Sequence, residues 1–314
     1  MTQLKPQNFV AVDVRAFLDA TAGQPPFRSL PIAEARAAVR QMAALVDLPP
    51  DPSVRSEDIS LNIDGTRQLR ARVFVPEAMS AAGPSIVYFH GGGWVTGDLD
   101  THDSLCRSIA ARTRLRLVSV DYRLAPEARF PAAYEDALAA TRLVLSSAHP
   151  AFAGTRGVVL AGDSAGGGLA AAVALELRGA PSVRAQLLLY PVLDVAGRSQ
   201  SYSESAEGYL LEAADMESFI DAYVPDRAQR SDWRCSPLLA ESFDGLAPLA
   251  LLTCGFDPLR DEGRSYAASC AKAGVNVHFV EAPGHIHGIA MLRLAIPSSQ
   301  EIMDRACAGL MTLL

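Results

Sequence analysis

The most regular pattern along the chain is a series of short apolar runs of strand length, separated by stretches of helical character. Near-continuous apolar runs are typical of strands buried on both faces, and such strands alternating with helices form parallel sheets. The pattern therefore predicts an α/β fold with a mostly parallel, doubly wound sheet and helices on both sides. The runs cover residues 85–89, 115–120, 158–161, 187–190, 249–254 and 275–280.

An alternating pattern of apolar and polar residues precedes these runs, over residues 57–76. It is interrupted at Asp64-Gly65, a dipeptide that favours a tight turn between two strands. We therefore expect a β-hairpin over residues 59–75, forming an antiparallel N-terminal edge of the sheet.

Two segments do not fit the alternation of strands and helices. Residues 1–50 are predicted to be helical, and residues 196–234 form a polar break with a helical stretch near its centre. Ligands of doubly wound sheets bind at the carboxyl ends of the strands, so we expect these segments to form N-terminal cap helices and a cap insertion there. Residues 51–195 and 235–314 would then form the catalytic α/β domain.

Composition narrows the range of partners. The 314-residue chain has a net charge of −7 and no cluster of basic residues, which disfavours nucleic acid and anionic membranes. The N-terminus lacks an apolar signal region, so we expect a cytoplasmic protein whose partner is a small molecule. The five cysteines include no C-x-x-C pair, which argues against disulfides and a zinc site. We expect no cofactor, and self-association into a homodimer is left open.

A candidate nucleophile follows the apolar run at residues 158–161. The sequence GDSAGG at residues 162–167 leads from this run into an alanine-rich helix. G-x-S-x-G between a strand and a helix is the pattern of a nucleophile elbow, in which glycines leave room for a serine on a tight turn. The alternative is a glycine-rich connection that carries an ordinary serine. A catalytic role for Ser164 therefore also requires a base and an acid elsewhere in the chain.

A glycine-rich loop with the sequence HGGGW, residues 90–94, follows the run at residues 85–89. Attack on an acyl carbon requires N–H donors directed at the developing oxyanion, and consecutive glycines let two such groups turn toward one point. The alternative is a phosphate loop, with Asp121 as the ribose-binding acid. It fails because Thr96 takes the third glycine position of G-x-G-x-x-G and Trp94 would block a pyrophosphate.

The base is expected among the last histidines, because acid and histidine follow the serine of such an elbow in chain order. His278 lies inside the last predicted strand, whereas His285 and His287 follow it in an expected loop. A base must reach the serine from a loop, and periodicity does not decide between these two histidines. A metal site at H-x-H is disfavoured because no further ligand lies at suitable spacing.

Asp257 is the expected acid, because it directly follows the apolar run at residues 249–254. Asp194, after the run at residues 187–190, is the alternative, since a neighbouring strand can supply the acid. Asp261 and Glu262 lie at an expected helix start and are interpreted as structural.

Together these motifs resemble the hormone-sensitive-lipase-like esterases, bacterial family IV of the α/β-hydrolase fold. The resemblance covers most of the chain and implies Ser164 as nucleophile, Asp257 as acid and His287 as base, with His285 as a bystander. It also implies an oxyanion hole formed by N–H groups of Gly92, Gly93 and Ala165, on a loop that begins at His90 and Gly91. The motifs are residues 90–94, residues 121–127 with 130–133, residues 162–167 and residues 257–262.

The chain departs from the family pattern beside the base. Ile289 replaces the usual phenylalanine, Ala282 stands where a tyrosine is common, and His285 replaces an apolar residue. We hypothesise that Trp94, His285 and Ile289 line the substrate pocket and that His285 adds a polar contact to substrate.

The expected function is a serine carboxylesterase that hydrolyses short-chain acyl esters of small molecules through an acyl-enzyme. A deacetylase, lactonase or amidase would use the same triad, and only recognition of the leaving group separates them. A non-catalytic receptor on the same fold, such as the gibberellin receptors, is disfavoured because those proteins lack the histidine that this chain has.

Overall fold

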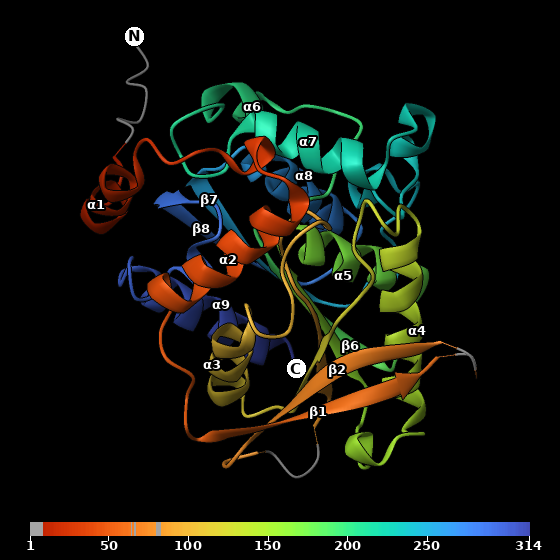
Figure 1. The fold of residues 1–314 in the computed structure, drawn as a ribbon. Coiled ribbons are helices and arrows are strands. Elements are labelled where there is room, and N and C mark those ends of the chain that lie inside the picture. Colours follow the sequence, from red (N-terminus) through yellow and green to blue (C-terminus); the bar gives the residue numbers. More distant parts are fainter. Residues whose placement is uncertain (1–8, 64, 66, 80–82) are drawn as a thin grey trace, which may run out of the picture.

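The computed structural model describes residues 9–63, 65, 67–79 and 83–314, whose strands form one eight-stranded sheet (Figure 1). The strand order is β1-β2-β4-β3-β5-β6-β7-β8. The predicted α/β-hydrolase architecture with a mostly parallel sheet is confirmed. The strands are β1 (Val54–Asn62), β2 (Gln68–Pro76), β3 (Ser85–Phe89), β4 (Leu117–Val120), β5 (Val158–Asp163), β6 (Val183–Leu189), β7 (Leu249–Phe256) and β8 (Val277–Ile286).

The antiparallel part of the sheet is the predicted hairpin. β1 pairs antiparallel with β2 from Val54 to Asn62, and β2 pairs antiparallel with β4. The pairs from β4 through β8 are parallel. The hairpin begins earlier than residue 59, and Asp64 of the predicted turn lies outside the described residues.

Helices cover both faces of the sheet, and the inner strands are apolar on both faces for this reason. Alternate residues of β3 and β5 divide between two cores: Val87 and Leu160 pack in one, Ile86 and Val159 in the other. On the first face lie α4 (Ala132–Ser146), α5 (Ser164–Glu176) and α8 (Arg260–Lys272), and on the second α3 (Asp103–Thr113) and α9 (Ser299–Leu313).

The last strand corrects one sequence expectation. Pro283 and Gly284 favour a loop, but β8 continues to Ile286, so His285 lies within the strand. A proline is tolerated here because β8 is the edge strand of the sheet. The pairing shifts between Cys254 and Phe256, after which Phe256 pairs with Ile286. The strand thus carries the chain directly to His287.

The first expected cap segment, residues 1–50, contains α1 (Val12–Thr21) and α2 (Ile32–Val46). The second, residues 196–234, contains α6 (Gln200–Glu204) and α7 (Ala213–Tyr223). Figure 1 shows α6 and α7 together at one end of the molecule, with α2 crossing beneath them. Arg28, which precedes α2, bonds to Glu212 and Asp215 at distances of 2.9 and 3.0 Å. The two segments are therefore joined directly, although they lie far apart in sequence.

The described residues include no helix that is both long and apolar enough to cross a lipid bilayer. Residues 1–8, on which the expectation about a signal region rests, lie outside the described part of the chain.

A buried ion pair fixes the end of α2 to the α/β domain. Arg293 is 1 % exposed and donates to both carboxylate oxygens of Asp47, at 2.8 and 2.7 Å, and to Ser104 Oγ at 2.7 Å. Beside it, the N–H groups of Leu294 and Ala295 donate to the carbonyl of the last α2 residue. The first cap segment therefore returns to the domain through a fixed connection.

Replacing Asp47 with alanine should destabilise the protein by about 3–5 kcal/mol, because it leaves the Arg293 charge buried without its partner. Urea unfolding checks this value. The double variant Asp47→Ala/Arg293→Met removes both charges and should recover much of the loss. A loss below about 1 kcal/mol in the single variant would show that water or another group replaces the carboxylate.

Candidate active site

Ser164 lies on the sharp turn between β5 and α5, with φ of +52°. Glycines on both sides make this turn sterically allowed. A Cβ atom at Gly166 would overlap the carbonyl oxygen of Phe89, and one at Gly162 would overlap the backbone of Gly166. Strain of this kind persists only when the surroundings fix it, and here it holds Oγ at the N-terminus of α5. This is the predicted elbow.

His287 lies between Ser164 and Asp257. Its Nε2 is 2.9 Å from Ser164 Oγ, and its Nδ1 is 2.8 Å from Asp257 Oδ2. An ionised carboxylate only accepts hydrogen bonds, so Nδ1 carries the hydrogen and Nε2 is left to accept from the serine hydroxyl. All three residues are buried, with at most 8 % of each exposed. The structure thus brings together the three residues to which the resemblance points.

The alternative residues lie in other hydrogen bonds. The Nε2 of His285 is 2.8 Å from Ser298 Oγ, and Ser298 also bonds to Asp13. Burial lowers the pKa of His285, and the charge of Asp13 opposes this effect. Asp194 Oδ1 accepts from the N–H groups of residues 196 and 197 at 2.9 and 2.8 Å. His278 packs against Gly309 of α9.

The glycine loop after β3 has the form that an oxyanion hole needs. Gly92 and Gly93 have φ of +112° and +61°, a region that favours glycine. Their N–H groups have no acceptor among the described residues. The N–H of Ala165 lies in the first turn of α5, where no intrahelical acceptor exists. The predicted donors are therefore available, whereas the N–H of Gly91 is bound to Asp163 at 2.8 Å.

A buried polar network under the loop was not predicted from the sequence. Asp163 is 3 % exposed and accepts hydrogen bonds from Tyr88 at 2.6 Å and from the N–H of Gly91. His102 Nε2 lies 3.3 Å from the same carboxylate oxygen. Burial raises the pKa of Asp163, but His102 and the Tyr88 hydroxyl outweigh it and keep this pKa below its usual range. The carboxylate beside the nucleophile thus anchors the glycine loop.

The residues that flank the glycine loop are buried in aromatic contacts. His90 stacks on Tyr122 with ring centres 4.3 Å apart, and burial lowers the pKa of His90 to about 4. His90 is therefore neutral at pH 7. Trp94 stacks on Tyr223 of α7 at 4.4 Å and is 2 % exposed. Ile289 is fully buried. Trp94 thus joins the glycine loop to the second cap segment.

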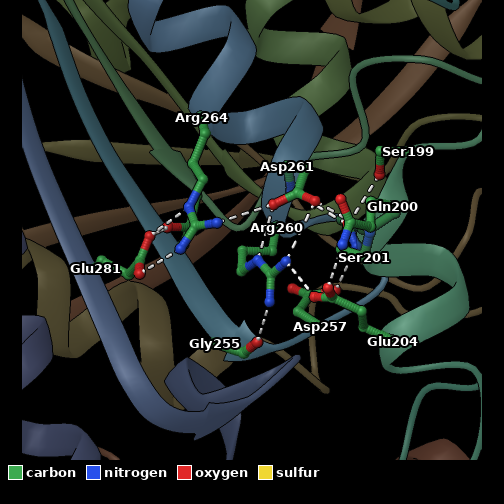
Figure 2. Close-up of polar contacts among 12 residues, drawn as sticks. Ser199, Gln200, Ser201, Glu204, Gly255, Asp257, Arg260, Asp261, Arg264 and Glu281 are labelled. Atoms are coloured by element: carbon green, nitrogen blue, oxygen red, sulfur yellow. Dashed lines mark hydrogen bonds and ion pairs between the residues drawn. The ribbon is translucent and has the colours of Figure 1, made fainter. Parts of the chain in front are cut away.

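The loop that carries Asp257 is held by a network that includes α6 (Figure 2). Ser201 Oγ donates to the carbonyl of Pro258 at 2.5 Å, and its N–H donates to Asp261 at 3.0 Å. Arg260 donates to Asp261 at 2.8 Å and to Glu204 at 2.6 Å. The structural interpretation of Asp261 is consistent with these bonds, which the sequence did not predict.

Two surface clefts of about 490 and 600 Å³ border α2. The first is lined by charged side chains such as Arg40 and Asp98, which bond to each other, and the second by residues around Pro49 and Leu294. Neither includes a triad residue. The bonded geometry at Ser164 is therefore the stronger indication of where chemistry occurs.

Glu262 lies behind the triad acid, in the first turn of α8, and accepts a hydrogen bond from the N–H of Leu193 at 2.7 Å. It is 3 % exposed. Burial raises the pKa of Glu262 well above its usual value, the charges of Asp194 and Asp257 raise it further, and the Leu193 bond opposes the rise. Folding therefore shifts the Glu262 carboxyl toward its protonated form.

The raised pKa of Glu262 predicts that the protein loses stability as the pH rises. An acid whose folded pKa exceeds its unfolded value of about 4.3 weakens folding as pH rises between the two values. Glu262→Gln keeps the acceptor for Leu193 but cannot ionise, so its stability relative to wild type should increase from pH 5 to pH 8. Urea unfolding at both pH values checks this. A constant difference between the two proteins would contradict the raised pKa.

Comparison with known proteins agrees with the fold. Residues 86–291 match a family described as alpha/beta hydrolase fold. The carboxylic ester hydrolase LipN of Mycobacterium tuberculosis is 40 % identical over 260 residues, covering 80 % of this chain and 69 % of its own. The ethyl acetate hydrolase of Pseudomonas putida is 36 % identical over 88 % of each chain.

Solved structures give the same result. A thermostable esterase from Pseudomonas putida superposes with a TM-score of 0.92 at 34 % identity, covering 99 % of both chains. An ester hydrolase from the metagenome of Lake Arreo, solved in complex with a bipyridine phosphonate derivative, superposes with a TM-score of 0.91 at 37 % identity. The match covers 97 % of this chain and 99 % of that protein. The fold and site define an α/β-hydrolase. Within that class, the chain belongs to the hormone-sensitive-lipase-like family, as predicted.

Proposed function

We propose that this protein is a serine carboxylesterase that hydrolyses short-chain acyl esters of small molecules. The observation that carries the proposal is the position of His287, bonded to Ser164 on one side and to Asp257 on the other. The names of the relatives, an ethyl acetate hydrolase among them, support an ester as the substrate and a small one in particular.

In the acylation step, His287 Nε2 accepts the proton of Ser164 Oγ while Oγ forms a bond to the ester carbonyl carbon. The carbonyl oxygen becomes an oxyanion that the N–H groups of Gly92, Gly93 and Ala165 stabilise. The carbon–oxygen bond to the alcohol then breaks, and the imidazolium returns its proton to the leaving alcohol. An acyl-enzyme remains on Ser164.

Deacylation repeats these steps with water as the nucleophile. His287 accepts a proton from water, the hydroxide adds to the acyl carbon, and Ser164 leaves with the returned proton. Asp257 holds the Nδ1 tautomer throughout and stabilises the transient imidazolium. Its own position is fixed by a 2.8 Å hydrogen bond from the N–H of Leu259 to Oδ1.

We assign substrate selection to a cap made of the described part of residues 1–50, from residue 9 onward, and residues 196–234. The bonds of Arg28 to Glu212 and Asp215 support treating these segments as one unit. Trp94, packed on Tyr223, is proposed as part of the pocket wall, and the buried Ile289 as support behind it. His285 would contact substrate only through Nδ1, which is buried and has no partner among the described side chains. A cytoplasmic location stays a prediction from the sequence.

The proposal is tested with p-nitrophenyl esters of increasing acyl length, using wild type and Ser164→Ala. Activity should peak at about two to six carbons and fall for longer chains that the cap excludes. The alanine variant should lose about 10⁶-fold in kcat, because the covalent step cannot occur. Equal rates for the two proteins would contradict the serine mechanism.

His287→Ala and His285→Ala form a matched pair that tests the base. We expect His287→Ala to lose at least about 10⁴-fold in kcat, since no group is left to accept the serine proton. His285→Ala removes a bond to Ser298 and should keep kcat within about threefold of wild type. Steady-state rates with p-nitrophenyl acetate measure both effects. Retained activity in the first variant and loss in the second would reverse the assignment.

A further inference from the structure

Arg36 of α2 connects the first cap segment to the glycine loop. Its Nε donates to the carbonyl of Val95 at 2.8 Å, and Nη2 donates to the carbonyl of Ala125 at 3.1 Å. Nη1 and Nη2 also bond to the two carboxylate oxygens of Glu127, at 2.9 and 2.8 Å. One planar guanidinium therefore holds two backbone carbonyls and one carboxylate at fixed relative positions.

Val95 directly follows the part of the loop that needs support. Gly92, Gly93 and Trp94 have consecutive positive φ values of +112°, +61° and +60°. For the tryptophan, this conformation is unfavourable and persists only where neighbouring groups fix the chain. The turn is closed by the N–H of Val95, which donates to the Gly92 carbonyl at 3.1 Å. The Arg36 bond to the Val95 carbonyl thus fixes the far end of this turn.

Ala125 is part of the same arrangement. Its N–H donates to the carbonyl of Trp94 at 2.8 Å, while its own carbonyl accepts from Arg36. The guanidinium therefore holds the loop twice, once directly at Val95 and once through Ala125. Phe219 of α7 also lies against the loop at Gly93, where it would overlap an added Cβ atom. Both cap segments thus contact the glycine loop or the residue that follows it.

We propose that Arg36 is a positioning residue for the oxyanion hole, because it orients the N–H groups of Gly92 and Gly93 by holding Val95 and Ala125. The position of α2 therefore affects the geometry of the oxyanion hole and the rate of catalysis. This inference rests on the proposed esterase function and deepens it. Arg36 touches neither Ser164 nor His287 and acts through the loop. Its loss should weaken binding of the transition state far more than binding of the substrate.

The alternative role is simple anchoring of α2 through the ion pair with Glu127. Glu127 is well exposed, with 62 % of its side chain accessible, and an exposed pair contributes at most about 1 kcal/mol. Arg40, one turn further along α2, bonds to Asp98 and provides a matched control. It anchors the same helix by an ion pair but has no bond to the carbonyls of residues 95 and 125 among those described.

The test compares Arg36→Gln and Arg40→Gln in kcat and KM for p-nitrophenyl acetate and in Ki for a methyl trifluoromethyl ketone. The ketone forms a bond from its carbonyl carbon to Ser164 Oγ, with the serine proton passing to His287, and its oxyanion occupies the hole. Arg36→Gln should lower kcat by about 10- to 100-fold and raise Ki by a similar factor, with KM within about twofold. Arg40→Gln should change all three by less than about twofold.

Arg36→Lys provides a second variant if the glutamine protein folds poorly. A lysine ammonium lacks the planar fork and cannot hold both carbonyls and Glu127, so kcat and ketone affinity should still fall while the melting temperature stays near that of wild type. Unchanged kcat and Ki in a folded Arg36 variant would overturn the proposal, as would equal losses in the Arg36 and Arg40 variants. Hydrolysis by wild type that does not depend on Ser164 would instead overturn the proposed function.

Discussion

The sharp turn at Ser164 determines how the other parts of the site are arranged. Because Gly166 lies against the carbonyl of Phe89, the start of α5 and the end of β3 are in direct contact. The loop that leaves β3 therefore begins beside the nucleophile, and Asp163 binds its first glycine N–H. One strained turn thus sets both the serine hydroxyl and the donors that would receive the oxyanion, which is the preorganisation that acyl transfer requires.

The cap segments are bonded to the parts of the chain that carry the chemistry. The first segment reaches the glycine loop through Arg36, which bonds to Val95, and the second reaches the loop of Asp257 through Ser201, which bonds to Pro258. The second segment also contacts the glycine loop, because Trp94 stacks on Tyr223 of α7. Under the proposed function, a substrate that displaces these segments would also strain the loops to which they are bonded. Such coupling provides a physical route by which substrate recognition affects the rate of the chemical step as well as binding.

Much of the fold and the elbow at Ser164 were predictable from the sequence because each depends on a local signal, whereas the choice of His287 over His285 came only from the family resemblance. Buried parallel strands are continuous apolar runs, and the elbow at Ser164 lies within a short motif between a strand and a helix. The extension of β8 through Pro283 was missed because edge position and an irregular pairing are properties of the whole sheet. The bonds of Arg36 and Ser201 were missed because their partners lie 59 and 57 residues away, and no local pattern specifies such pairs.

Ser164 is proposed as the nucleophile of a triad completed by His287 and Asp257. Labelling the protein with a p-nitrophenyl alkylphosphonate and locating the adduct by peptide mass spectrometry tests this role. Displacement of p-nitrophenolate should leave one phosphonyl group on Ser164, and His287→Ala should slow labelling by orders of magnitude because no base accepts the serine proton. Labelling at another serine, or equal labelling rates in wild type and His287→Ala, would show that Ser164 and His287 do not have these roles.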